Sequence, residues 1–162
     1  MATYLFAWNP KLWPWDELPA EQRKLRRRGH LDTQWSAGRV RHIEVGSRAF
    51  FMRLGVPPKG IIGAGFTLTE PQPGPHWLPA RAAAGVITQF IQLRLDSMYT
   101  LPLVTAEDLA KPPFSRFRWT IRASGVRIPS TLADALENLW ETRLAAAIKA
   151  DQAGSRHRVR RG

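Results

Sequence analysis

The sequence predicts an α+β fold, with a small curved sheet or partly open barrel of five or six strands and helices on its flanks. Two patterns carry this prediction. Several short segments alternate apolar and polar residues with the period of a strand, and turns rich in glycine or proline separate them. One segment near the C-terminus instead places leucines at helical spacing, which is typical of a helix packed against a sheet.

The expected strands follow from this alternation. Residues 48–54 form the clearest one, because apolar side chains recur at every second position. In residues 60–66, Gly63 and Gly65 share a face, so that another element or a ligand can approach closely there. Further segments with strand character, not all of which need be counted as separate strands of the sheet, are residues 4–8, 40–45, 86–95, 116–121 and, as a short segment, 126–128.

Two segments are predicted to be loops, and each carries a tryptophan. Residues 30–38 hold Trp35, and residues 70–79 hold Trp77 among four prolines and a glycine. Proline cannot donate to a strand ladder, so the second segment is expected to lie at the surface without regular structure.

Helical signals are fewer. Asp16 suits the N-cap of a short helix before the cationic run 21–28, and residues 105–109 have the pattern of a capped helical turn. Ser130 or Thr131 is expected to cap a long C-terminal helix, with Trp140 on its buried side.

We expect one domain, residues 1–150. Residues 151–162 lack apolar periodicity and are predicted to be a flexible basic tail, or a linker cut short of another domain.

Composition restricts the class of partner. The formal net charge is +11, which favours binding to polyanions such as nucleic acid. No apolar run approaches the roughly 20 residues of a membrane span, and no signal peptide is evident, so we expect no membrane partner. The chain has no cysteine, which excludes disulfides, thiol catalysis and cysteine-based zinc sites. We therefore expect a cytoplasmic protein, associated with the nucleoid if its source is a prokaryote.

Catalytic motifs are missing from the sequence. The four histidines have no metal-binding spacing, residues 60–65 lack the lysine of a phosphate-binding loop, and the acidic residues resemble helix starts rather than an acid/base pair. We expect a binding domain without a cofactor or metal rather than an enzyme.

Trp35 and Trp77 are the candidates for a binding site, because each lies in a segment without periodicity, beside small or turn residues. Both are compatible with a role as loop anchors packed on the sheet. Alternatively they hold a flat group between them, since stacking a base on an aromatic ring is worth about 1–3 kcal/mol. Asn9 and Ser36 are then the polar groups that read the edge of the base.

Arginines are the candidates for contacts with the nucleic-acid backbone. Residues 21–28 contain five cations, which suits either a solvated helix face or a phosphate-binding patch. The expected backbone contacts are Arg26, Arg27, Arg28, Arg39, Arg41, Arg116 and Arg118.

The ordered set of motifs resembles the EVE domain, a PUA-like family related to the YTH domains that read methylated adenine. The residues that carry the resemblance are Tyr4-Leu5-Phe6-Ala7-Trp8-Asn9-Pro10, Trp13, Trp15, Trp35-Ser36-Ala37-Gly38, residues 46–51, Leu54-Gly55, residues 60–65, His76-Trp77 and residues 124–129. The resemblance implies a PUA-like curved sheet with an aromatic pocket for a flipped, modified base. It places Trp35 and Trp77 as cage residues and Asn9 and Ser36 at the base edge, with Ser124 and Trp119 as further base-binding candidates. Trp119 is equally compatible with the core.

The resulting hypothesis is a reader that flips a modified base, above all 5-methyl- or 5-hydroxymethylcytosine in DNA, into an aromatic cage. By resemblance, such domains serve modification-dependent restriction, fused to a nuclease or partnered with one. Two alternatives remain: a PUA-like module for structured or modified RNA, and a protein-interaction domain whose charge only ensures solubility.

Overall fold

A computed structural model describes residues 1–161 and has the α+β architecture that the sequence predicts. Its open, mixed sheet contains eight strands, more than the five or six expected. The hydrogen-bonded path runs β2-β6-β4-β3-β1-β8, while β5 pairs with β6 and β7 pairs with β4. The strands are β1 (Thr3–Trp8), β2 (Leu31–Gly38), β3 (Arg48–Arg53), β4 (Gly60–Thr67), β5 (Gln72–Pro75), β6 (Ile87–Met98), β7 (Val104–Thr105) and β8 (Val126–Ile128).

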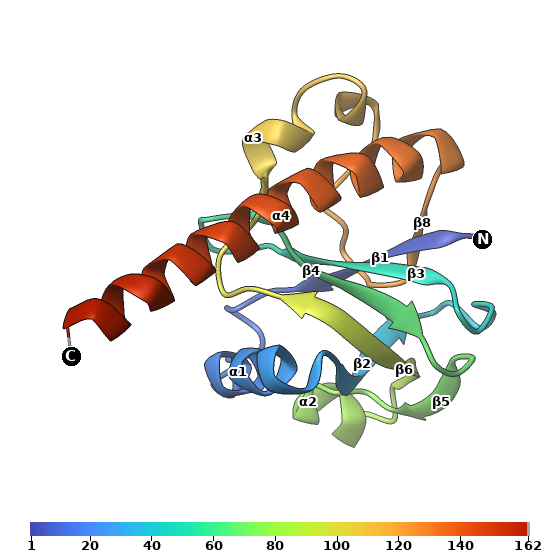
Figure 1. The fold of residues 1–162 in the computed structure, drawn as a ribbon. Coiled ribbons are helices and arrows are strands. Elements are labelled where there is room, and N and C mark those ends of the chain that lie inside the picture. The colour runs from blue at the N-terminus through green and yellow to red at the C-terminus, as the bar shows by residue number, and fades with distance from the viewer. Residues whose placement is uncertain (162) are drawn as a thin grey trace.

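Helices lie on both sides of the sheet (Figure 1). The long helix α4 covers one side, whereas α1 and α2 lie at the other. The helices are α1 (Leu18–Arg28), α2 (Pro79–Ala83), α3 (Ala106–Leu109), the 3₁₀ helix η1 (Phe114–Arg116) and α4 (Ser130–Arg161). The predicted capped turn is confirmed at α3, where the Thr105 and Asp108 side chains form a reciprocal capping box.

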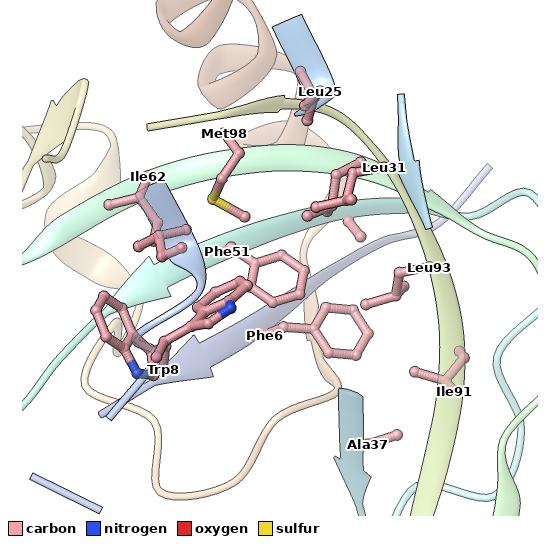
Figure 2. Packing of buried hydrophobic residues seen from close by; sticks show 14 of the residues in the cluster. Phe6, Trp8, Leu25, Leu31, Ala37, Phe51, Ile62, Ile91, Leu93 and Met98 are labelled. Atoms are coloured by element: carbon pink, nitrogen blue, oxygen red, sulfur yellow. The ribbon is translucent and has the colours of Figure 1, made fainter. Parts of the chain in front are cut away.

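The central strands bury side chains on both faces, because successive residues of a strand point to opposite sides. Phe6 and Phe51 enter one hydrophobic cluster, which Figure 2 shows together with Leu25 of α1. Leu5 and Phe50 enter the second cluster, with Leu136 and Trp140 of α4. The prediction that Trp140 belongs to the core is confirmed.

Glycines in β4 allow its neighbour to approach, as the sequence indicates. A Cβ atom at Gly65 would collide with the carbonyl group of Arg94 on β6, and one at Gly63 would press on Ser97 and Met98. The neighbour is a strand and not a ligand, so these glycines serve the curvature of the sheet.

The N-cap of α1 is Glu17 and not the predicted Asp16. Four predictions of strands and loops are also wrong. Residues 40–45 form no strand, because side chains of Ser47 and Thr67 bind the Glu44 carbonyl in place of a strand partner. Residues 30–38 contain β2, which pairs antiparallel with β6, and residues 70–79 contain β5, which tolerates prolines because it bonds to β6 alone. Residues 116–121 form no strand either: Arg116 ends η1, and Trp119 Nε1 donates locally to the Phe114 carbonyl oxygen at 2.8 Å.

The expected flexible tail is helical up to Arg161, while its last residue, Gly162, lies outside the described residues. Alanine and arginine are good helix formers, and a single glycine at position 154 does not end a helix that packs elsewhere along its length. Asp151 also accepts an ion pair from Arg26 of α1 at 3.1 Å, which ties this part of α4 to the body. The domain boundary at residue 150 stays a prediction.

Candidate nucleic-acid interface

A pocket of about 670 Å³ opens where the ends of several strands and loops meet. Its walls come from the end of β1 and the loop after it, the end of β2, the start of β6, α2 and residues 121–124. Five of the predicted base-binding residues line it although they lie far apart in the sequence: Asn9, Trp35, Ser36, Trp77 and Ser124. The pocket volume lies in the range of small-molecule sites.

Trp35 belongs to both the pocket and the core. Its Nε1 donates to the Ala7 carbonyl oxygen at 3.1 Å, and its ring centroid lies 5.0 Å from that of Trp15 and 5.3 Å from that of Phe51. Much of its ring is therefore held by protein, and only the remainder is available to a ligand.

Trp77, in contrast, lies at the rim of the pocket. It stacks on His76 with 5.3 Å between ring centroids, and the edge-on ring of Trp13 lies 6.3 Å away. Trp13 is 43% exposed and also lines the pocket. Sequence reasoning missed Trp13 and His76 as site residues, although both flank prolines or loops in the way that singled out Trp77.

The Ser36 hydroxyl has a defined hydrogen-bonding state. Thr88 Oγ1 donates its one proton to the Gly38 carbonyl oxygen at 3.0 Å. Ser36 Oγ, 3.2 Å from Thr88 Oγ1, must then be the donor in that pair. Ser36 also accepts from the Gly38 amide at 3.1 Å, and its remaining lone pair offers a ligand an acceptor but no donor.

Asn9 offers the complementary group. Its Oδ1 accepts from the Lys11 amide at 3.0 Å, whereas within residues 1–161 its Nδ2 donates no hydrogen bond. Gly55 leaves room for this side chain, since a Cβ atom there would collide with it. Ser124 is already engaged, because its hydroxyl accepts from the Ala7 amide at 2.9 Å and so fixes residues 121–124 against β1.

Trp119 lies outside the pocket. Its side chain is buried in the second hydrophobic cluster, beside Phe114 and Phe117. Of the two positions that the sequence allowed for Trp119, the structure therefore shows the core and not the pocket.

The pocket is electropositive at its rim. Arg39, Arg81 and Arg122 line it and are exposed, and no aspartate or glutamate from residues 1–161 does so. Arg39 was predicted from the sequence. Arg81 and Arg122 were not, because single arginines in a short helix and in a loop carry no pattern that indicates convergence.

The other predicted backbone contacts lie away from the pocket walls. Arg41, Arg116 and Arg118 are exposed and do not line it. Arg26, Arg27 and Arg28 are exposed at the C-terminal end of α1, where Arg26 pairs with Asp151.

His76 is held in its neutral form. Burial, and then the nearby charge of Arg81, lower the pKa of His76 below its ordinary value of 6.5. Its Nδ1 also accepts a hydrogen bond from the Leu78 amide at 3.0 Å, which requires that nitrogen to be unprotonated. A neutral ring stacked on Trp77 results.

Two other kinds of feature are absent from residues 1–161. No group of three histidine, aspartate or glutamate side chains is placed to hold a metal ion. No helix there is long and apolar enough to cross a membrane.

No family model matches the sequence, and no curated protein is significantly similar to it in sequence. Solved structures, however, share its fold. A hypothetical protein from Leishmania major is 12% identical with a TM-score of 0.59, over 88% of this chain and 97% of that one. The protein PSPTO5229 from Pseudomonas syringae is 16% identical with a TM-score of 0.58, over 85% and 99%.

A third structure of this fold is human THYN1 in complex with DNA that contains 5-methylcytosine. It is 14% identical with a TM-score of 0.54, over 86% of this chain and 97% of that one. The chain has a PUA-like fold. The PUA-like architecture agrees with the EVE-domain resemblance of the sequence, and at these identities the similarity concerns the fold alone.

Proposed function

We propose that this chain is a nucleic-acid-binding reader that holds a modified base, rotated out of a DNA duplex, in the pocket. The observation that carries the proposal is the lining itself: aromatic rings beside three exposed arginines, with no acidic residue from residues 1–161. Aromatic faces suit a base, and arginines suit the phosphates that flank it. The 5-methylcytosine DNA bound by THYN1, a protein of the same fold, supports this choice of ligand.

Extrusion of a base costs a few kcal/mol, and stacking in the pocket offsets this cost at about 1–3 kcal/mol per base. Trp77 is the proposed stacking surface, and the exposed part of Trp35 closes the pocket. Arg39, Arg81 and Arg122 hold the backbone on either side of the rotated nucleotide.

The polar groups favour a base that carries an exocyclic amine. Ser36 offers an acceptor and Asn9 a donor. Cytosine presents an amine donor beside ring and carbonyl acceptors on its Watson–Crick edge, as adenine presents an amine beside a ring acceptor. Thymine has the same methyl group as 5-methylcytosine but reverses this pattern. We therefore propose that 5-methyl- or 5-hydroxymethylcytosine binds with its amine toward Ser36, an orientation in which thymine would set its O4 acceptor against the Ser36 acceptor.

The protein acts by binding and not by catalysis in this proposal, and it directs a nuclease, fused or separate, to modified DNA. That last step rests on the resemblance to EVE domains. An RNA ligand is the competing outcome, since PUA-like modules also recognise structured RNA.

The test uses one duplex sequence in which a single position carries cytosine, 5-methylcytosine, 5-hydroxymethylcytosine or thymine opposite guanine. We expect a preference for a modified cytosine and rejection of thymine. The unpaired polar groups would cost thymine about 1–3 kcal/mol, or roughly 5- to 150-fold in affinity. Equal affinity for all four duplexes would refute the modified-base proposal. Tighter binding to the matching RNA would replace DNA by RNA as the ligand.

A further inference from the structure

The C-terminal part of α4 extends past the rest of the molecule (Figure 1). From Asp151 to Arg161 it spans roughly 15 Å at 1.5 Å per residue. All of its residues are exposed, and it carries four arginines against one acid, Asp151. Neither the pocket nor the core uses these arginines.

The same region meets the cationic end of α1. Arg26 of α1 pairs with Asp151 at 3.1 Å, with about half of each side chain exposed. The Arg26 guanidinium also lies 5.9 Å from the ring centroid of Tyr99, which is half-buried after β6. The cationic end of α1 therefore meets α4 at the start of its basic C-terminal segment, with an aromatic ring beside the contact.

Helical spacing defines which cations face this place. Arg158 lies seven residues after Asp151, so it shares the face that Asp151 turns toward α1, and Arg161 follows three residues later. On α1, Arg23 lies three residues before Arg26 and shares its flank. We call Arg23, Arg26, Arg158 and Arg161, together with Asp151 and Tyr99, the basic corner.

Helix stability alone does not account for this arrangement. Cations at a helix C-terminus interact favourably with the dipole by about 0.3–1 kcal/mol each, but only within the last turn. Placing the cationic end of α1 beside the basic segment of α4 adds repulsion between like charges. Asp151 offsets this repulsion at Arg26 alone. A bound polyanion would relieve the rest.

The charge pattern favours nucleic acid over a membrane. A membrane-surface helix needs an apolar face of large residues opposite its cations. The exposed part of α4 offers only Val159 after Asp151, beside alanine, glycine and polar residues. Cations with one aromatic side chain instead suit the sugar–phosphate backbone.

We propose that the basic corner is a second nucleic-acid-binding surface, which binds the phosphate backbone of a duplex at a distance from the base-binding pocket and without reading sequence or modification. It rests on the proposed function only in taking nucleic acid as the ligand. The pocket then selects the base, while the corner supplies affinity and holds the duplex.

The experiment measures the affinity of the full chain for an unmodified DNA duplex by fluorescence anisotropy, between 50 and 200 mM salt. In the double variant Arg158→Gln/Arg161→Gln, the slope of log affinity against log salt should become shallower by up to about 1.8, which is 0.9 per lost phosphate contact. The matched control, Lys111→Gln/Arg127→Gln, removes the same charge from exposed positions outside both surfaces and should leave the slope unchanged.

A second variant removes a negative charge instead of positive ones, so that its expected gain in binding cannot be explained by loss of folding. Asp151→Asn should strengthen binding to every duplex, because it removes the one acid of the corner. Glu141→Gln, which makes the same charge change ten residues earlier on an exposed part of α4, should strengthen binding less. Circular dichroism checks that α4 stays helical in all variants.

The outcomes separate this inference from the proposed function. Variants of the corner arginines should weaken binding to DNA and RNA duplexes alike and leave the ratio of modified to unmodified affinities unchanged, whereas pocket variants should change that ratio. An unaltered slope in Arg158→Gln/Arg161→Gln would refute binding of the phosphate backbone by the basic corner, even if the pocket still distinguishes modified from unmodified DNA. Loss of binding to phosphatidylserine vesicles with unaltered DNA binding would overturn it in favour of a membrane.

Discussion

Replacing Trp77 and replacing Trp35 by alanine should have different consequences, although both side chains line the pocket. Trp35 contacts Trp15 and Phe51 and donates to the Ala7 carbonyl, so its loss opens a cavity in the core. Trp77 contacts the rings of His76 and Trp13 at the rim.

The expected magnitudes follow from these contacts. Burial of a whole tryptophan is worth 3–5 kcal/mol relative to alanine, and Trp35 is partly exposed, so we expect Trp35→Ala to cost about 3 kcal/mol of the free energy of unfolding. Trp77 is also partly buried, and its aromatic pairs add to the value of that burial, but it does not contact the buried rings of Trp15 and Phe51, so we expect Trp77→Ala to cost less, about 2 kcal/mol. The loss of a stacked base should instead appear in binding, at about 1–3 kcal/mol or roughly 5- to 150-fold.

Urea denaturation followed by tryptophan fluorescence measures the first quantity, and anisotropy with cytosine and 5-methylcytosine duplexes measures the second. Trp77→Ala should lose less stability than Trp35→Ala and should lose its preference for the modified duplex. Trp77→Phe is the control, since it keeps a flat ring and should keep part of the preference. Full preference in Trp77→Ala would refute stacking on Trp77, and equal stability of the two alanine variants would refute the core placement of Trp35.

Three further predictions concern polar groups. Ser36→Ala should lower the free energy of unfolding by about 1 kcal/mol through lost internal hydrogen bonds and should erase the preference for 5-methylcytosine over thymine; retained rejection of thymine would exclude Ser36 as the acceptor. Because the folded pKa of His76 lies below 6.5, its contribution to stability is complete above that pH and is lost as pH falls through the folded value. Thermal melts and binding from pH 7.5 to 5 should therefore show declining stability and discrimination, which His76→Gln should flatten. Burial acts to raise the pKa of Asp108, but hydrogen bonds from Thr105 and Arg143 outweigh it and lower this pKa from 3.8, so its contribution is complete above about pH 3.8 and disappears at lower pH. Asp108→Asn should lower the melting temperature at pH 5 and flatten its dependence between pH 5 and 2; an unchanged acid limb would refute the role of this carboxylate.

Elements with strong local patterns were predictable from the sequence. Strand β3 shows a clear period of two, the Thr105 capping box lies within four residues, and α4 begins at its predicted position. In each case the interactions that select the structure lie within a few residues or follow from burial of one face.

Elements that depend on a partner strand were harder to predict. β5 contains two prolines and has no strand character by itself. β2 alternates Leu31, Trp35 and Ala37 with polar residues, so its strand period was present in the sequence and was overlooked. Each forms because β6 offers it a free row of backbone donors and acceptors. At Trp119 a strand was predicted and none forms. The alternating residues around it favour a strand, but a hydrogen bond from Trp119 Nε1 to the Phe114 carbonyl oxygen holds this segment in a turn.

By itself, the sequence determined the chemistry of this protein: its net positive charge, the tryptophans outside apolar runs, and the Asn9 and Ser36 groups suited to a base edge. The tertiary structure alone decided which of these groups meet. It brought Asn9, Ser36, Trp77 and Ser124 to one pocket and removed Trp119 from it. Convergence of this kind depends on strand pairing and register between segments up to 117 residues apart, such as Ala7 and Ser124, and no local pattern encodes such distances.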